Sequence, residues 1–400
     1  MTRPDVVLLS TAEWGNPFWT NKQHVACELA RRGHRVFYID SLGLRRPSAS
    51  RSDLLRIFRR LARGMKAPRK VRDGILVWSP LVLPLHGNPV VGRLNRLWLE
   101  RMLALWLRRF GFRRDWFWTY NPLTTRFLRS GRFGRVVYHC VDEIAAQPGM
   151  PAELITRHER ELCSRADVVF VTAPKLLESR ARWSRRACFM PNVADFDHFA
   201  RARSDAVEVP EDLARLPKPR IGFIGAISGY KLDFELIAEV ARVRPEWSFV
   251  LIGKVGEGDP WTDVSVLRAL ENVHLVGPRA YADLPACLKG MDVAILPNRL
   301  NEYTAHMFPM KFFEYLAAGK PVVSVPLPAL QDFSQVATCA ADAADFVRGI
   351  EAALAGRGPT RDERLAVARQ YTYRARTGRM LALIEKLPPR GATAKREGAP

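Results

Sequence analysis

Lys311 and Glu314 are two charged residues near the beginning of a predicted helix, three positions apart. They belong to "FPMKFFEYLAAGKPVVSV" (308–325), in which apolar residues recur at helical spacing until a glycine and a proline stop the helix. The valine-rich run that follows is typical of a strand in a parallel sheet, so this is half of a β-α-β unit. The beginning of the helix then faces the carboxyl edge of the sheet, where open α/β folds bind ligands and a helix N-terminus favours phosphate.

A second group of candidate residues lies in "GFIGAISGYKLDFELI", between a predicted strand and a predicted helix. Gly225, Ser228 and Gly229 are small enough for a backbone to approach a phosphate, and Lys231 can neutralise its charge. Glycine-rich turns of this kind also occur for purely structural reasons. Their place at the same sheet edge as Lys311 favours a phosphate site.

The elements that position these residues alternate between strand and helix in both halves of the chain. Strands separated by helices predict a parallel sheet with both faces covered, and the pattern restarts after a charged, proline-punctuated linker at 201–219. The fold class is therefore α/β, with two doubly wound domains and a cleft between their facing sheet edges. The helical pattern of 361–387 is followed by no strand, and 388–400 reads as a frayed tail. The first strand runs into "STAEWGNPFWT" instead of GxGxxG, which disfavours an NAD enzyme.

Positive charge is concentrated in the first half of the chain. Residues 1–200 hold 35 Lys and Arg against 17 Asp and Glu, whereas residues 201–400 hold 27 against 24. Part of this excess lies in a predicted amphipathic helix, which has arginines on one face and apolar residues on the other. Basic amphipathic helices of this kind bind anionic lipid surfaces. An ordinary surface helix and a nucleic-acid partner are the alternatives, the latter without a recognisable binding motif. The predicted membrane-surface residues are Arg56, Arg59, Arg60 and Arg63.

Targeting and metal signals are missing from the sequence. The N-terminus lacks the apolar core of a signal peptide, so we expect a cytoplasmic chain. Prolines and glycines interrupt the uncharged stretch 74–92, so no transmembrane helix is predicted. The six cysteines form no CxxC pair, which favours reduced thiols over disulfides or zinc.

Most of the chain resembles GT-B glycosyltransferases of the glycosyltransferase family 4 type, particularly the teichuronic-acid or exopolysaccharide branch. The segments that carry this resemblance are "KFFEYLAAGKPVVSV", "GPRAYADLPACLKGMDVAILP", "GFIGAISGYKLDFELIAEVARVRPEWSFVLIG", "MPNVADFDHF" and "WGNPFWTNKQHVACELARRGHRVFYID". The resemblance implies a Rossmann-like acceptor domain at 1–205, a Rossmann-like nucleotide-sugar domain at 206–364, and a helix at 365–387 that crosses back to the first domain.

The resemblance also implies roles for individual residues. Glu314 would bind the ribose hydroxyls of a UDP- or GDP-sugar, and Lys311, Lys231 and the amides around Met310 would lie near its diphosphate. Arg279 lies in the segment that corresponds to the family's loop that contacts the base of the nucleotide. The donor-binding prediction comprises Gly15, Asn16, Gly225, Ser228, Lys231, Arg279, Met310, Lys311 and Glu314.

Catalysis is predicted at the end of a strand in the first domain. "VVYHCVDE" places His139 and Asp142 close to the expected cleft, where they would orient the acceptor or the sugar, and a carboxylate there can accept a proton. Lys231 completes the predicted catalytic set. Residues at a strand end also cap helices, so a structural role is the alternative.

The reaction implied is a retaining, metal-independent transfer of the sugar to a lipid-linked or saccharide acceptor at the inner face of the membrane. No cofactor is expected, because the nucleotide-sugar is a substrate. One departure affects sugar recognition: the family often has a glutamate eight positions before the ribose glutamate, and here that residue is His306, with Glu302 nearby. A sugar-nucleotide epimerase, a nucleic-acid-binding protein and a noncatalytic scaffold stay open as alternatives.

Overall fold

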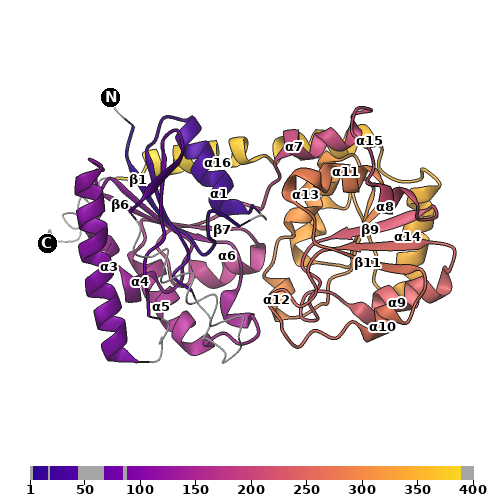
Figure 1. Cartoon of the computed structure of the whole chain (residues 1–400), viewed down its shortest axis with the longest axis horizontal. Coiled ribbons are helices and arrows are strands. Elements are labelled where there is room, and N and C mark those ends of the chain that lie inside the picture. The colour runs from indigo at the N-terminus through magenta and orange to yellow at the C-terminus, as the bar shows by residue number, and fades with distance from the viewer. Residues whose placement is uncertain (1–2, 17–18, 44–66, 84–87, 389–400) are drawn as a thin grey trace, which may run out of the picture. The chain divides into compact units, whose positions relative to one another are not determined.

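The chain folds into two compact units, each built around its own sheet (Figure 1). The computed structural model describes residues 3–16, 19–43, 67–83 and 88–388. The N-terminal unit comprises 1–172, 176–190 and 377–400, and the C-terminal unit comprises 173–175 and 191–376. The predicted basic helix with Arg56, Arg59, Arg60 and Arg63 lies outside the described residues.

The sheet of the N-terminal unit has eight strands, all parallel to their neighbours except β3, which is antiparallel to β4. Four short strands, β1, β2, β5 and β7, are buried at every position, as expected where helices cover both faces of a parallel sheet. In spatial order the strands are β3 (Arg69–Arg72), β4 (Ile75–Trp78), β2 (Val36–Ile39), β1 (Val6–Leu9), β5 (Trp116–Thr119), β6 (Arg135–Cys140), β7 (Val168–Val171) and β8 (Ala187–Phe189).

The helices of this unit vary in length, and α3 is 21 residues long. They are α1 (Asn21–Arg31), α3 (Pro89–Arg109), α4 (Thr124–Phe127), α5 (Ala152–Arg165) and α6 (Pro174–Ala181), with 3-10 turns at Ser130–Arg132 and Ile144–Ala146.

The sheet of the C-terminal unit has six strands, all parallel. In spatial order they are β11 (Val273–Gly277), β10 (Ser248–Ile252), β9 (Arg220–Ile224), β12 (Val293–Leu296), β13 (Val322–Ser324) and β14 (Thr338–Cys339). Because β9 and β12 are neighbours in the middle of this sheet, the loops after them emerge side by side at one edge.

The remaining helices precede, connect or follow these strands, and the last of them, α16, lies mostly in the N-terminal unit. They are α7 (Phe196–Ala200), α8 (Glu211–Ala214), α9 (Phe234–Val243), α10 (Ser265–Arg268), α11 (Leu284–Lys289), α12 (Glu302–Ala305), α13 (Met310–Ala317), α14 (Ala343–Leu354), α15 (Arg361–Gln370) and α16 (Tyr373–Glu385), with 3-10 turns at Arg201–Arg203, Tyr281–Asp283 and Pro328–Phe333. The prediction of two parallel α/β sheets is confirmed.

The predicted helix over 361–387 is wrong in one respect, because the chain forms α15 and α16 with a break at Tyr371 and Thr372. The ring of Tyr371 stacks on Phe313 at 4.4 Å between centroids, and the Tyr371 carbonyl accepts a hydrogen bond from the Ala194 amide. These contacts with distant parts of the chain interrupt the helix.

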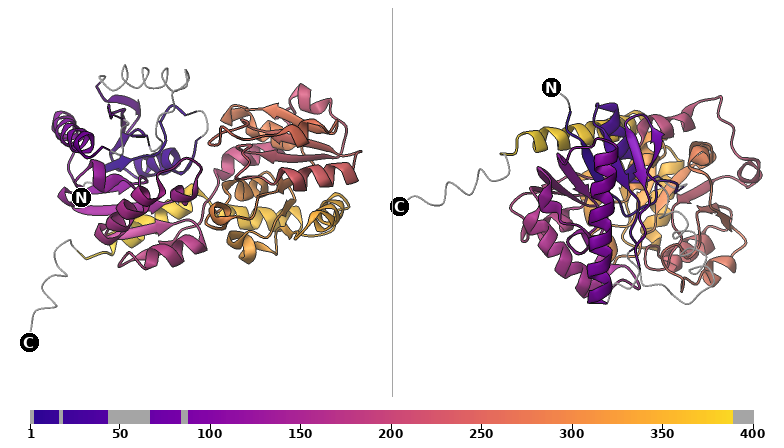
Figure 2. Two further views of the ribbon diagram at one scale, coloured as in Figure 1. Left: turned by 90° about the horizontal axis from the view of Figure 1, so that it is seen from below. Right: turned by 60° about the vertical axis from the view of Figure 1, so that its left-hand side comes forward.

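The last helix contributes to the core of the N-terminal unit, although its first turn belongs to the C-terminal unit. Met380, Leu381, Ile384 and Leu387 are buried together with side chains of the eight-stranded sheet. Arg135 of β6 also donates hydrogen bonds to the carbonyls of Leu387 and Pro388. Figure 2 shows α16 running beside the strands of this unit.

Among the helices within the described ranges, none is long and apolar enough to cross a membrane. All six cysteines are free thiols, and only Cys339 is exposed.

Candidate functional site

The beginning of α13 is fixed against the carboxyl end of β9. The hydroxyl of Tyr315 accepts a hydrogen bond from the Ile224 amide at 2.8 Å and lies 3.3 Å from the Ile224 carbonyl oxygen. Phe312, Phe313 and Leu316 bury the inner side of the helix, and Gly319 ends it with φ of +78°. The predicted helix and its glycine stop are therefore present, and its N-terminal turn lies at the carboxyl edge of the sheet.

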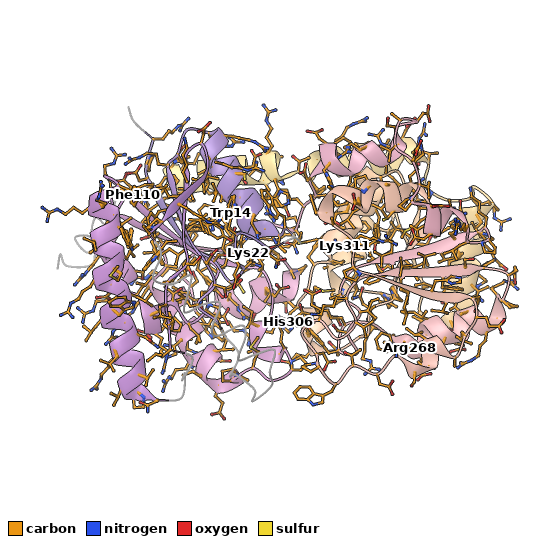
Figure 3. All side chains as sticks on the ribbon, in the orientation of Figure 1. Trp14, Lys22, Phe110, Arg268, His306 and Lys311 are labelled. Atoms are coloured by element: carbon orange, nitrogen blue, oxygen red, sulfur yellow. The ribbon has the colours of Figure 1, made fainter. Side chains whose placement is uncertain are left out.

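Lys311, labelled in Figure 3, forms an ion pair with Glu314 on this helix. The Lys311 ammonium nitrogen is 2.7 Å from Oε2 of Glu314, and the glutamate is only 3% exposed. Within the described residues, the hydrogen bond of the Glu314 carboxylate runs through Oε2 to Lys311, and Oε1 makes none. The two side chains therefore form an ion pair across one helical turn, and this pair uses one of the two oxygens of the carboxylate.

Lys231 lies in the loop after β9, and the neighbouring loop after β12 holds its backbone. The Lys231 carbonyl accepts hydrogen bonds from the Arg299 amide at 3.0 Å and from the side chain of Asn298 at 3.1 Å. The Lys231 ammonium lies 5.3 Å from the ring centre of Tyr230 and 5.7 Å from that of Tyr303. Aromatic faces stabilise a cation without neutralising it, so the charge stays available to an anion.

Gly225 and Ser228 shape the same loop by their own packing. A side chain at Gly225 would bring its Cβ within 2.7 Å of the Phe223 ring. The Ser228 hydroxyl is buried and donates to the Glu257 carbonyl at 2.5 Å, and the Gly229 amide donates to Thr262 at 3.1 Å. The small residues of this loop are therefore required by its own packing and hydrogen bonds.

Arg279, in the loop after β11, forms an ion pair with Asp212 of α8. Its side chain is less than one-third exposed. The guanidinium is therefore already bound to a carboxylate, so a base contact would have to use the rest of this loop or displace Asp212.

His198 and Tyr281 were not predicted, and the structure places them near Glu314. Their rings stack at 4.2 Å between centroids, and Nε2 of His198 lies 2.8 Å from the Tyr281 carbonyl oxygen. Burial lowers the pKa of His198, whereas burial and then the Glu314 carboxylate raise the pKa of Tyr281. Both residues occur in segments that carry the family resemblance, which was the available signal.

His306 follows α12 at the position where the family often has a glutamate (Figure 3). Its Nδ1 atom lies 2.8 Å from the carbonyl oxygen of Glu302, one helical turn earlier. Glu302 itself is exposed. The imidazole is therefore held against α12 by the carbonyl of Glu302, the first residue of that helix.

The predicted catalytic residues of the N-terminal unit differ in exposure. His139 is fully buried, with its ring 4.8 Å from that of Tyr120, whereas the sequence predicts a position close to the cleft. Asp142 follows the end of β6, is partly exposed, and accepts a hydrogen bond through its carbonyl from the Ile144 amide. Strand β6 lies inside the sheet and is covered on both faces, which encloses His139.

A buried ion network lies beneath the Asp142 loop and was not predicted. Arg180 donates to both oxygens of Glu143, at 2.5 and 3.0 Å, and to Glu159 at 2.7 Å. The hydroxyl of Tyr138 donates to Glu159 at 2.6 Å. This network fixes the residue next to Asp142.

Gly15 and Asn16 lie in the loop after β1, next to the buried Trp14 (Figure 3). The Trp14 amide donates to Asp40 at 2.7 Å, which anchors the loop, and a Cβ at Gly15 would meet no atom within 4 Å. Gly15 is exposed, so its backbone is accessible to solvent.

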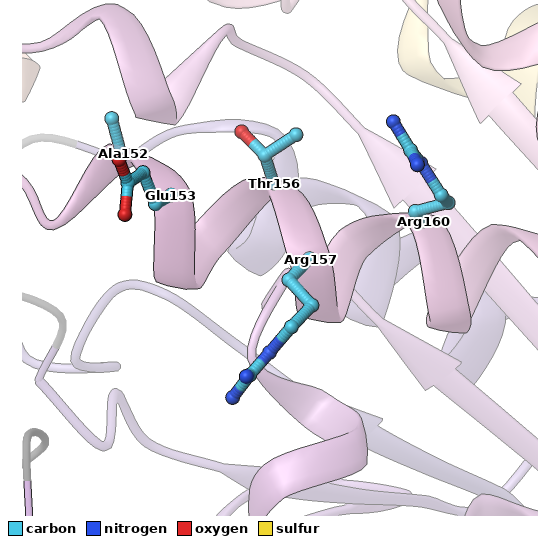
Figure 4. A pocket seen from close by; sticks show the side chains of 5 residues that line it. All are labelled: Ala152, Glu153, Thr156, Arg157 and Arg160. Carbon is cyan, nitrogen blue, oxygen red and sulfur yellow. The ribbon is translucent and has the colours of Figure 1, made fainter.

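A separate surface hollow lies on α5 of the N-terminal unit (Figure 4). None of the predicted site residues lines it. Its lining residues are Ala152, Glu153, Thr156, Arg157 and Arg160.

Within the described ranges, no group of three or more His, Cys, Asp or Glu side chains is placed to hold a metal ion.

Comparison with known sequences identifies the region that contains Lys231, Lys311 and Glu314. Residues 218–356 match the family described as "Glycosyl transferases group 1". A protein of Bacillus subtilis (strain 168), TuaH, provisionally named a teichuronic acid biosynthesis glycosyltransferase, is 40% identical over 108 residues. That match spans 27% of this chain and 27% of the relative.

Solved structures show the fold of the whole chain. Sucrose-phosphate synthase from Thermosynechococcus elongatus has a TM-score of 0.69 at 16% identity, covering 96% of this chain and 99% of that one. Anabaena HepE in complex with UDP has a TM-score of 0.62 at 16% identity, covering 96% and 100%. The trehalose-6-phosphate protein from E. coli, bound with UDP-2-fluoro glucose, has 0.64 at 12% identity, covering 96% and 100%.

The two parallel sheets and these neighbours confirm the predicted GT-B fold. The chain therefore has the GT-B fold, and its residues 218–356 match the group 1 glycosyl transferases.

Proposed function

We propose that this chain is a glycosyltransferase that moves a sugar from a UDP- or GDP-sugar to a lipid-linked or saccharide acceptor in cell-surface polysaccharide biosynthesis. The observation that carries the proposal is the buried Glu314 carboxylate in α13, which binds Lys311 through Oε2 and leaves Oε1 without a hydrogen bond among the described residues. The name of the B. subtilis relative supports the polysaccharide, and neighbours bound with UDP or a UDP-sugar support the donor class.

In this proposal the donor binds along the carboxyl edge of the C-terminal sheet. Oε1 of Glu314 accepts hydrogen bonds from ribose hydroxyls, and the amides at the N-terminal turn of α13 face the diphosphate. Lys311 and Lys231 add positive charge, and both are held in place, one by Glu314 and the other by the rings of Tyr230 and Tyr303. These groups stabilise the charge that develops on the departing nucleoside diphosphate.

The proposed chemistry is retaining and needs no metal ion. The acceptor oxygen attacks the anomeric carbon on the face that the diphosphate leaves, so the new bond has the old configuration. Asp142, partly exposed after β6, serves as the proton acceptor in the proposal. The full burial of His139 argues against direct contact with a substrate, so its role becomes one of packing beside Tyr120.

Peripheral association with the inner face of the membrane is also part of the proposal, because a lipid-linked acceptor is presented there. The predicted basic helix at residues 56–63 lies outside the described residues. The support for membrane association is therefore the net charge of the chain, which is +21.

The first test is calorimetric titration of the full chain with UDP, GDP, ADP and dTDP in the presence of EDTA. We expect one nucleotide to bind, and the Glu314→Ala variant to weaken that binding by about 1.5–3 kcal/mol, as expected for lost hydrogen bonds to a charged group. Asp142→Asn is the matched control, because it should keep nucleotide affinity while losing sugar transfer.

Three results would contradict this assignment. Failure of all four nucleotides to bind would remove the donor site, and unchanged binding by Glu314→Ala would remove the ribose role of that residue. Conversion of the donor without any acceptor, seen in the products, would indicate an epimerase instead.

A further inference from the structure

The outer side of α3 carries a stripe of exposed apolar side chains. Of the eleven exposed large hydrophobic residues within the described ranges, six lie on α3 or on the segment just before it, and the other five are spread over different elements. The six, with their exposed fractions, are Leu83 (47%), Val90 (60%), Leu94 (55%), Leu97 (47%), Trp98 (47%) and Leu105 (53%).

The spacing of these residues places them on one side of the helix. Positions 97 and 98 both lie one turn after position 94, which lies one turn after position 90, and position 105 lies two turns after position 98. Arg101 and Arg108 continue the same rows, and both are exposed. The outer side of α3 is thus a mixed surface of apolar and cationic side chains.

The opposite side of α3 is firmly attached to the N-terminal unit. Leu99, Leu103 and Leu107 are at most 3% exposed. The side chain of Asn95 exchanges two hydrogen bonds with the backbone of Leu83, at 2.9 and 3.0 Å. A Cβ at Gly92 would approach the Arg126 guanidinium to 2.8 Å, so the helix packs closely there. Because this side is fixed, the outer side stays turned outward (Figure 1).

The charges of α3 favour an anionic partner. The helix contains five arginines and one carboxylate, and that carboxylate, Glu100, is turned inward, where it accepts a hydrogen bond from the Arg129 amide at 3.0 Å. No acidic residue of α3 therefore accompanies the apolar stripe. Two copies of the chain that met through this stripe would place the arginines of both copies in one interface with no acidic residue of the stripe to offset them, which disfavours self-association.

We propose that α3 is a docking helix that lies in the interface of an anionic lipid bilayer. Val90, Leu94, Leu97 and Leu105 would enter the boundary between headgroups and acyl chains, Trp98 would sit at headgroup level, and Arg101 and Arg108 would reach lipid phosphates. The helix is about 30 Å long and would lie parallel to the membrane plane.

This inference adds a second, structurally described membrane contact to the proposed function. The proposed function supplies the reason for docking, because a lipid-linked acceptor would be presented at a membrane. Docking itself requires neither donor nor acceptor, so its failure would leave nucleotide binding at Glu314 untouched.

The test is flotation of the full chain with vesicles made of equal parts phosphatidylcholine and phosphatidylglycerol, compared with phosphatidylcholine alone. The double variant Leu94→Ser/Trp98→Ser should weaken binding to the anionic vesicles at least about tenfold. Arg101→Gln and Arg108→Gln should each weaken it about fivefold. The matched control is Val243→Ser/Trp261→Ser, which changes two apolar residues of the C-terminal unit that are 53% and 75% exposed and should bind like the wild type.

Hydrogen exchange on the wild type gives a second measurement that needs no variant. Amides of residues 90–108 should exchange more slowly when anionic vesicles are present. Vesicle binding that the α3 variants leave within twofold of wild type would overturn the proposal. So would the absence of vesicle binding together with a dimer that Leu94→Ser/Trp98→Ser dissociates, since the stripe would then bind a second copy.

Discussion

Arg180 is a single side chain that holds two buried carboxylates in the N-terminal unit. It contacts Glu143 on one side and Glu159 on the other, and its own side chain is 2% exposed. Glu143 directly follows Asp142, so the guanidinium positions the loop that carries the proposed proton acceptor. A charge in this position acts on the site without touching a substrate.

Replacing Arg180 by methionine should therefore destabilise the protein strongly. The variant would leave two carboxylates buried without their cation, and removing one partner from such an arrangement typically lowers the free energy of unfolding by about 3–5 kcal/mol. Urea denaturation of Arg180→Met measures the change. The exposed Arg182→Met variant, two positions along the chain, is the control and should stay within about 0.5 kcal/mol of wild type. A loss below 1 kcal/mol in Arg180→Met would mean that the network contributes little.

Single residues were predictable where their partners are close in sequence. The Lys311 and Glu314 pair follows from helical spacing alone, and the structure contains it. Arg180 was not predictable, because its partners lie 21 and 37 positions away and only the packed sheet brings them together. The burial of His139 was not predictable for a related reason: five of the six positions of β6 are buried because the strand is covered on both faces, so a polar residue on it need not face solvent.

At the scale of elements, Lys320 ties three pieces of the C-terminal unit together. It follows α13, precedes β13, and donates hydrogen bonds to the carbonyls of Met291 at 2.6 Å and Lys289 at 3.2 Å. The Lys289 carbonyl belongs to the last turn of α11, where a cation is favourable. Burial nevertheless lowers the pKa of Lys320 from 10.5 to about 8.

This lowered pKa predicts a pH effect on stability. Between about pH 8 and pH 10.5 the unfolded chain keeps a proton on Lys320 that the folded chain has released. The free energy of unfolding should therefore rise with pH across this window, relative to the Lys320→Met variant, which has no proton to release. Denaturation series of both proteins at several pH values give the difference. Lys254→Met, an exposed lysine, should follow the wild type, and parallel curves for Lys320→Met and wild type would contradict the prediction.

Helices and strands were predictable where hydrophobic periodicity and glycine or proline residues mark them. They were less predictable where tertiary contacts determine the element boundaries. The valine-rich strands and the glycine-stopped α13 follow from local sequence. The break between α15 and α16 does not, because its causes are the stacking of Tyr371 on Phe313 and a backbone contact with Ala194. The two-residue strand β14 is too short to leave a periodic pattern.

At the scale of the whole molecule, the final helix completes the N-terminal core from the far end of the chain. Ile384 is 1% exposed and belongs to the same cluster as Val6 and Trp118. Ile384→Ala should lower the free energy of unfolding by about 2–5 kcal/mol. Hydrogen exchange should show the loss in the amides of β1, β5 and β6 and spare those of β9 and β12. Leu354→Ala, on an exposed position of α14, is the control, and equal loosening of both sheets by Ile384→Ala would contradict the assignment of α16 to the N-terminal core.

The contribution of α16 also sets an order of events during protein synthesis. The ribosome makes all eight strands of the first sheet before it makes Met380, Leu381 and Ile384, which that sheet needs to close its core. The C-terminal unit, in contrast, has every strand and most of its helices available before α16 emerges. The half of the chain that is translated first is therefore the half that finishes folding last, and until α16 emerges part of its apolar core stays uncovered.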